Sequence, residues 1–276
     1  MSIEFHKMHG AGNDFVLIDA REQSFETDPG QAARIANRRF GIGCDQILVL
    51  RPAKDEKHLL KYEIWNADGT LAGQCGNGAR CVAYFIELAG QYPGHRYTVE
   101  SPSGIVTMQR CDDGEYELEM AVPAFAPEDV PIHSVPENHR YFLESPWGPL
   151  EFGAVSMGNP HCLVIVDDIS DERIPAMGAW LQSREIFVDG VNAGFAQLVD
   201  RSSIQLRVVE RGAGETLACG TGACASVVIL RQWDLLDDCV DVSLPGGHLV
   251  IKWLKTGQAP LMRGPAEYIY RGIMDE

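Results

Sequence analysis

Two cysteines, 144 residues apart, stand in nearly the same local sequence. Cys75 lies in QCGNGARC at residues 74–81, and Cys219 lies in ACGTGAC at residues 218–224. The apolar segment after each one predicts that the thiol begins a helix, where unpaired amides and the positive end of the dipole lower a cysteine pKa. Two such groups on opposite sides of one carbon can remove a proton from one face and return one to the other. The pair therefore indicates acid–base inversion of a stereocentre.

Glycines follow both thiols, at positions 76, 78, 220 and 222. Glycine lets the backbone approach a ligand closely, and amides at a helix start bind anions. We therefore expect the two helix starts to hold the carboxylate of an amino acid whose Cα is deprotonated.

Other uses of cysteine fit less well. The chain has no C-x-x-C redox motif, and the spacings 75/81 and 219/224 do not match structural zinc sites. We assign the remaining six cysteines to packing as free thiols: Cys44, Cys81, Cys111, Cys162, Cys224 and Cys239. No lysine lies beside a glycine-rich phosphate cradle, which argues against pyridoxal phosphate. We expect no metal and no cofactor.

An internal duplication places the two thiols in equivalent positions. Cys75 follows Asn66 by nine residues, as Cys219 follows Glu210. Upstream, residues 12–19 (GNDFVLID) are echoed by residues 158–167 (GNPHCLVIVD). A third pair aligns residues 43–49 with residues 193–199, so that the same three elements occur in the same order twice.

The apolar periodicity predicts short strands and four helices. Strands are expected at 15–19, 46–50, 62–65, 97–100, 116–120, 163–166, 204–209, 240–244 and 249–253. Helices are expected from Asp28-Pro29 to before Gly41, near Pro175, at 76–89 and at 220–233. The last two are apolar almost all round, which is typical of a buried helix. The pattern predicts an α/β (α+β) fold in which a sheet wraps a central helix, twice.

Bulk properties limit the possible partners. The 276 residues carry a net charge of −16, with 45% hydrophobic residues. Without a basic patch, neither nucleic acid nor an anionic membrane surface is expected as a partner. No apolar run is long enough to span a bilayer or to resemble a signal peptide, so we expect a cytoplasmic protein. The proline-rich stretch 123–136 is expected to connect two domains.

Polar residues recur in the repeated elements, beside the expected strand ends. Arg211 offers a fork for a carboxylate, Glu210 can accept from an ammonium, and His161 could orient or deprotonate a thiol. The set considered as ligand contacts is Asn13, Gln46, Asn66, Asn159, Asn192, Glu210 and Arg211. Together they suggest a ligand that is charged at both ends.

With these residues in place, the chain resembles the diaminopimelate epimerase family over its whole length. The matching segments, in the family's order, are MHGAGNDF (8–15), NADG (66–69), QCGNGAR (74–80), GNPH (158–161), ERGAGET (210–216) and ACGTG (218–222). The resemblance implies an isomerase that interconverts LL- and meso-diaminopimelate without a cofactor, for lysine and peptidoglycan precursors.

The resemblance also implies roles for individual residues. Cys75 and Cys219 match the acid–base pair, with His161 and Glu210 flanking the thiols. Residues that match substrate contacts are Asn13, Gln46, Asn66, Gly76, Asn77, Asn159, Asn192, Glu210, Arg211, Gly220 and Thr221.

The implied architecture is two pseudo-symmetric domains, each a mixed sheet or barrel around a central helix, with the active site in the cleft between them. The first domain spans 1–120 and takes back a C-terminal strand within 263–276, while the second spans 121–262. Domain closure over the substrate and a homodimer are also implied.

A proline- or hydroxyproline-type racemase is the nearest alternative, because it too uses two cysteines. Its cyclic substrate has no distal charged group, which would leave Arg211 and the asparagines without a purpose. A thiol redox or metal-binding protein is the alternative from another class.

Overall fold

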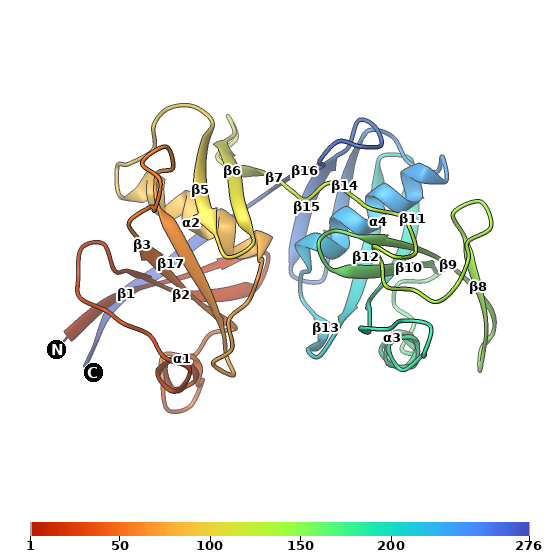
Figure 1. Cartoon of the computed structure of the whole chain (residues 1–276), viewed down its shortest axis with the longest axis horizontal. Helices are drawn as coiled ribbons and strands as arrows, with labels where there is room; N and C mark the ends of the chain where they lie inside the picture. The colour runs from red at the N-terminus through yellow and green to blue at the C-terminus, as the bar shows by residue number, and fades with distance from the viewer. Residues whose placement is uncertain (1, 276) are drawn as a thin grey trace. The chain divides into compact units, whose positions relative to one another are not determined.

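The computed structural model describes residues 2–275 and divides the chain into two compact units. Unit 1 comprises residues 1–119 and 263–276, and unit 2 comprises residues 120–262. The chain therefore passes between the units twice. Each unit contains one long helix among curved strands, labelled α2 and α4 in Figure 1.

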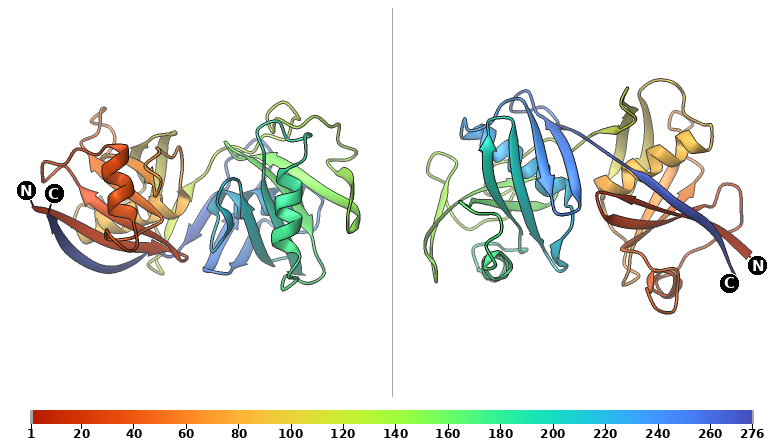
Figure 2. Two further views of the ribbon diagram at one scale, coloured as in Figure 1. Left: turned by 90° about the horizontal axis from the view of Figure 1, so that it is seen from below. Right: turned by 180° about the vertical axis from the view of Figure 1, so that it is seen from behind.

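Unit 1 is built from nine strands or parts of strands and two helices. The strands are β1 (Ser2–Gly10), β2 (Asn13–Asp19), β3 (Gln46–Arg51), β4 (Lys61–Asn66), β5 (Tyr97–Ser101), β6 (Gly104–Arg110), β7 (Tyr116–Glu119), the end of β16 (Leu261–Gly264) and β17 (Glu267–Asp275). The helices are α1 (Pro29–Ala36) and α2 (Gly76–Leu88). Strand β17 pairs antiparallel with β1, so both ends of the chain lie together, as Figure 2 shows.

Unit 2 repeats this plan. Its strands are β8 (Tyr141–Ser145), β9 (Gly148–Ser156), β10 (Pro160–Ile165), β11 (Asn192–Asp200), β12 (Ser203–Glu210), β13 (Gly214–Thr216), β14 (Cys239–Leu244) and β15 (Gly247–Lys252). Its helices are α3 (Ile174–Gln182) and α4 (Gly220–Gln232).

The strand ladders show the duplication directly. In unit 1, β2 is antiparallel to β1, parallel to β3, and β3 is antiparallel to β4. In unit 2, β10 is antiparallel to β9, parallel to β11, and β11 is antiparallel to β12. In each unit the long helix is followed by a further strand. Strand β5 is parallel to β4 in unit 1, and β14 is parallel to β12 in unit 2. The predicted fold class, a mixed sheet around a central helix in each of two repeated domains, is confirmed.

The third sequence echo had the wrong register. Phe15 pairs with Gln46, and His161, the counterpart of Phe15, pairs with Asn192. Gln46 is therefore equivalent to Asn192, four residues before Ala196, with which the echo aligns it. Matching residue types misled the alignment, because ladder register is set by the pairing of whole strands.

The central strands of unit 1 are buried on both faces, which explains their continuous apolar sequence. Val16 and Ile18 on β2 belong to a core shared with α1. Phe15 faces the other way, where it lies beside the start of α2 at Gly78. Helix α2 is thus enclosed, in contact with β1, β2, β6, β7 and β17.

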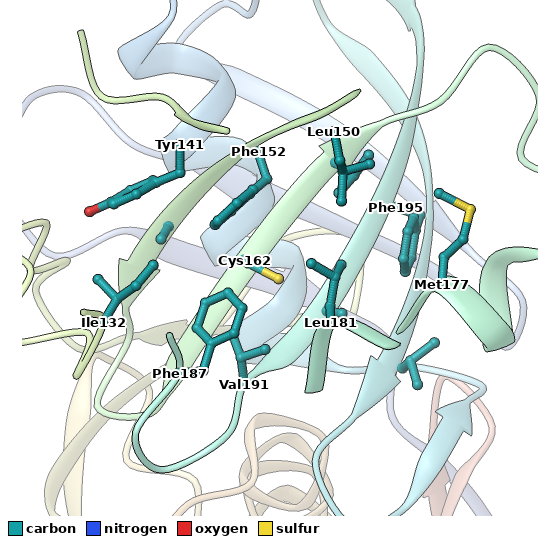
Figure 3. Close-up of a cluster of buried hydrophobic side chains, with 14 of the residues drawn as sticks. Ile132, Tyr141, Leu150, Phe152, Cys162, Met177, Leu181, Phe187, Val191 and Phe195 are labelled. Atoms are coloured by element: carbon teal, nitrogen blue, oxygen red, sulfur yellow. The ribbon is translucent and has the colours of Figure 1, made fainter. Parts of the chain in front are cut away.

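A hydrophobic core of unit 2 lies under α3 (Figure 3). Strand residues Phe152 and Phe195 and helix residues Met177 and Leu181 are all buried there. Phe152 stacks on Tyr141 with ring centroids 5.3 Å apart. Helix α4 packs on the other side, against β9, β10, β11 and β15.

Helix α1 ends earlier than predicted. The backbone of Asn37 is extended, with ψ of 119°, so the helix stops at Ala36. The Asn37 side chain then accepts hydrogen bonds from the amides of Arg39 and Phe40, at 2.9 Å each. This local competition for backbone donors is the reason the asparagine ends the helix.

The linker prediction was wrong. Residues 123–136 lie inside unit 2, where Val130 and Ile132 belong to its core. Several strands were also missed from the sequence, including β1, β6, β8 and β9. Helices α2 and α4 start where predicted and end one residue early. Among residues 2–275, no helix is both long enough and apolar enough to cross a membrane.

Candidate functional site

Each unit gathers its predicted site residues at one edge of its sheet. In unit 1, Asn13 and Gln46 begin the parallel strands β2 and β3, and Asn66 ends the antiparallel strand β4. Opposite strand directions therefore bring both strand starts and one strand end to the same edge. Cys75 follows as the residue that caps α2.

Cys75 is held from two sides within unit 1. Its extended backbone (φ −150°, ψ 107°) lets the sulfur fold back over the helix start, where the amide of Gly78 donates to Sγ at 3.4 Å. The thiol in turn donates to Asn13 Oδ1 at 3.6 Å. The predicted helix-start position of Cys75 is confirmed.

Gln46 and Asn66 form a hydrogen-bonded pair at the same sheet edge of unit 1. Gln46 Nε2 donates to Asn66 Oδ1 at 2.8 Å, and Asn66 Nδ2 donates to Thr70 Oγ1 at 3.0 Å. Gln46 Oε1 is buried and has no hydrogen-bond partner among the described residues. A buried acceptor of this kind is costly unless a ligand or water satisfies it.

Unit 2 repeats the arrangement with different chemistry. Asn192 begins β11 and Glu210 ends β12, at the edge where Cys219 caps α4. Glu210 is the structural counterpart of Asn66, so a carboxylate replaces an amide. Its Oε1 accepts from Thr216 Oγ1 at 2.5 Å.

The Cys219 thiol contradicts the expectation of a lowered pKa. Only 5% of the residue is exposed, and this burial raises its pKa well above the ordinary value. The nearby Glu210 carboxylate raises the pKa further. A contact between Sγ and Thr221 Oγ1 at 3.6 Å lowers the pKa, but less strongly. Desolvation and a like charge therefore outweigh the helix terminus, and Cys219 is a thiol at neutral pH.

His161 is a neutral, buried residue of β10. Burial lowers its pKa to about 3, and the positive charge of Arg211 acts in the same direction. Its Nε2 lies 3.0 Å from Asn159 Oδ1, so the neutral ring donates from Nε2. His161 therefore bears no charge near neutral pH.

This histidine should make unit 2 sensitive to acid. A group whose pKa is depressed on folding stabilises the protein above its unfolded pKa of about 6.5, and that stability is lost as the pH falls towards 3. We expect the free energy of unfolding to fall by about 2 kcal/mol from this residue between pH 7 and pH 5. Urea unfolding of His161→Gln should show a shallower pH dependence, while the exposed His133→Gln should match the parent. Equal slopes in all three would contradict the assignment.

Asn192 bridges protein groups on both sides of its amide. Nδ2 donates to the carbonyl of Pro160 at 3.0 Å, and Oδ1 accepts from the amide of Arg211 at 2.9 Å. The guanidinium of Arg211 also donates to the Asp189 carbonyl. Asn192 thus fixes the backbone that carries Arg211, while its predicted substrate contact stays a prediction.

Two of the motif glycines have a packing role that the sequence reading did not include. A Cβ on Gly78 would lie 3.1 Å from Leu48 and 3.2 Å from Phe15, and one on Gly222 would lie 3.0 Å from Val208. These contacts are tight because each helix start sits directly on its strands. The glycines therefore let the thiol-bearing ends of both helices approach the sheet.

Sequence reasoning missed Asp45 and Arg80 as parts of the site region. Asp45 accepts from Asn13 Nδ2 at 3.1 Å, and the fully buried Arg80 donates to Asn77 Oδ1 at 2.8 Å and to the Pro265 carbonyl at 3.0 Å. The available signals were the position of Asp45 next to Gln46 and a charged residue in an otherwise apolar helix.

The structure therefore assembles the predicted residues of each unit at one sheet edge. All eight cysteines are free thiols. Within residues 2–275, no group of three or more His, Cys, Asp or Glu side chains is arranged to hold a metal ion. The assigned roles of these residues, and the action of Cys75 with Cys219 on one substrate, stay predictions.

Solved structures with similar folds include racemases and epimerases. A hydroxyproline epimerase from Agrobacterium vitis superimposes with a TM-score of 0.72 at 16% identity, covering 99% of this chain and 92% of that one. A PhzF-family phenazine biosynthesis protein from Bacillus anthracis gives a TM-score of 0.68 at 15% identity, with complete coverage of both chains. At these identities the likeness concerns the fold alone.

Sequence comparison is more specific. The family model described as diaminopimelate epimerase matches residues 5–125 and 153–269. The diaminopimelate epimerase of Xanthomonas euvesicatoria pv. vesicatoria is 44% identical over 98% of this chain and 95% of its own length. That of Thioalkalivibrio sulfidiphilus is 45% identical over the full length of both chains. The predicted resemblance is confirmed: the chain belongs to the diaminopimelate epimerase family.

Proposed function

We propose that this protein inverts one stereocentre of diaminopimelate, interconverting the LL and meso forms, with Cys75 and Cys219 as the acid–base pair. Family membership supports the reaction and the substrate. The observation that carries the two-thiol assignment is the placement of these cysteines as caps of α2 and α4, the equivalent helices of the two repeated units.

The route requires no cofactor. One sulfur removes the α-proton of the substrate as a thiolate, and the other, as a thiol, delivers a proton to the opposite face. Amides at the two helix starts, at Gly76–Asn77 and Gly220–Thr221, stabilise the reacting carboxylate as negative charge develops on it.

Glu210 has a specific part in this scheme. Cys219 starts as a thiol because of its burial and the neighbouring carboxylate. It is therefore ready to donate a proton in one direction of the reaction. In the other direction its proton passes to Glu210, which Thr216 holds in place. His161 is the second residue that the family resemblance implies beside the thiols.

The distal end of the substrate accounts for the remaining polar residues. In this proposal Arg211 pairs with the distal carboxylate, and Asn66, Asn159 and Asn192 contact its other polar groups. This set separates the proposal from a proline-type racemase, whose substrate has no such end.

Solvent hydrogen exchange tests the proposal. Purified, reduced protein in heavy water should incorporate deuterium at an α-carbon of LL-diaminopimelate as meso product forms, and should leave proline unlabelled. Labelling of proline but not of diaminopimelate would overturn the substrate assignment.

A homodimer and a cytoplasmic location complete the proposal. Strand β17 lies outside β1 and exposes Ile269 (50%), Tyr270 (45%) and Ile273 (72%), an apolar surface suited to a second copy. We expect Ile273→Lys to sediment as a monomer. Val199→Lys, which alters an exposed apolar residue of unit 2 (58%), should remain dimeric. A dimeric Ile273→Lys protein would remove β17 from the interface.

A further inference from the structure

A chain of three hydrogen bonds passes beside Cys75. Arg80 donates to Asn77 Oδ1 at 2.8 Å, and Asn77 Nδ2 donates to Asn13 Oδ1 at 3.4 Å. Asn13 Nδ2 then donates to Asp45 Oδ2 at 3.1 Å. The chain links a buried guanidinium to a carboxylate through two asparagine amides.

The two charged ends fix the direction of every bond. A guanidinium can only donate and a carboxylate can only accept, so neither amide can turn over without placing two donors or two acceptors together. Asp45 therefore keeps Nδ2 of Asn13 towards itself. The carbonyl oxygen of Asn13 must then face the sulfur of Cys75, at 3.6 Å.

Asp45 is itself firmly placed. It precedes Gln46, as Asp14 precedes Phe15, and the parallel pairing of those two residues sets both carboxylates side by side. The amide of Asp14 donates to Asp45 Oδ2 at 3.1 Å, and the amide of Asp45 donates to Asp14 Oδ1 at 2.9 Å.

Two cations complete this cluster. Arg38 donates to Asp14 at 2.6 Å and to Asp45 at 2.8 Å, and Lys7 donates to Asp14 at 2.5 Å. Burial raises the pKa of Asp14, but the hydrogen bonds from Arg38 and Lys7 dominate and hold that pKa well below its usual range. Asp14 thus stays ionised at neutral pH and holds Arg38, which also donates to Asp45.

Opposite influences therefore meet at the Cys75 sulfur. The amide of Gly78 donates to it, which favours thiolate, whereas the carbonyl of Asn13 accepts from it, which favours thiol. Resting on the proposed function, we propose that Asp45 is a positioning residue of the acid–base site: it orients the Asn13 amide and thereby sets the protonation of Cys75.

Alkylation of Cys75 tests this without any turnover. The rate of iodoacetamide labelling is followed against pH, and mass spectrometry of the Cys75 peptide separates this thiol from the other cysteines. In Asp45→Ala the Asn13 amide loses its anchor, so the midpoint of the labelling curve should fall by about 0.5 to 1 pH unit. Asp45→Asn removes the charge but keeps an acceptor oxygen, and its midpoint should stay near that of the parent.

Two further variants make the result decisive. Asn13→Ala removes the acceptor oxygen while leaving the Asp14, Asp45 and Arg38 contacts in place, so its midpoint should fall as in Asp45→Ala. If thermal unfolding shows that Asp45→Ala has lost its fold, Asn13→Ala takes its place in the test. Asp55→Ala alters a similarly exposed carboxylate, paired with Lys57, and should not shift the midpoint.

Three results would overturn the inference. They are an unchanged midpoint in Asp45→Ala, an unchanged midpoint in Asn13→Ala, and a shift in Asp45→Asn as large as in Asp45→Ala, which would indicate a charge effect. A protein that fails to exchange diaminopimelate hydrogen would contradict the proposed function instead, since the labelling curves do not depend on it.

Discussion

Replacing Cys75 or Cys219 with serine is expected to lower the epimerisation rate by about 10³-fold or more. A serine hydroxyl is a much weaker acid than a thiol and supplies almost no base at neutral pH, so one of the two proton transfers fails. Steady-state kinetics with LL-diaminopimelate measure the loss. Cys239→Ser, which changes an exposed thiol on β14, should retain full activity.

A sharper result follows from the geometry of two bases. Each single variant keeps one thiol, which can still exchange the hydrogen that faces it and return deuterium to the same face. One variant should therefore label LL-diaminopimelate, and the other should label the meso form at its D centre, in both cases without inversion. If both variants labelled the same isomer, the two cysteines would not act on opposite faces.

The sequence was sufficient to place both thiols, because their positions depend on local features. A capping position directly before a strongly apolar periodic segment is a local signal of a helix start. The family assignment rests on the same segments, which are long and ordered. The repeated strand order also followed from the echoes around Asn13 and Asn159.

Properties that depend on tertiary surroundings could not be predicted from the sequence. The raised pKa of Cys219 comes from burial and from Glu210, nine residues earlier at the end of β12. The equivalence of Gln46 with Asn192 needed the ladder register. Residues 123–136 look like a linker because prolines are frequent there, yet Val130 and Ile132 pack into the unit 2 core.

Asp45 and Arg80 show a third kind of limit. The sequence signal of each residue is weak, since most aspartates and most helical arginines are solvated residues of the protein surface. Their importance arises from what they orient, and hydrogen-bond direction cannot be seen until donors and acceptors have been placed.

Glu210→Gln is the second substitution with a large expected effect. In the proposed scheme Glu210 takes the proton of Cys219, and an amide cannot do so. We expect kcat to fall by about 10²-fold or more. KM should rise as well, since the substrate ammonium loses its carboxylate partner, and separate measurement of kcat and KM distinguishes these two losses.

The charge on Glu210 also raises the pKa of Cys219, which disfavours the thiolate that catalysis needs. Burial is the larger cause of the raised pKa of Cys219, and the Glu210 carboxylate is the second. Removing that charge should lower the pH at which Cys219 is alkylated, so Glu210→Gln should contain more thiolate and yet turn over more slowly. Glu215→Gln, which alters the neighbouring carboxylate held by Arg207, should change neither quantity. If Glu210→Gln lost activity while Cys219 became harder to alkylate, the carboxylate would not be acting on this thiol, and another residue would have to receive its proton.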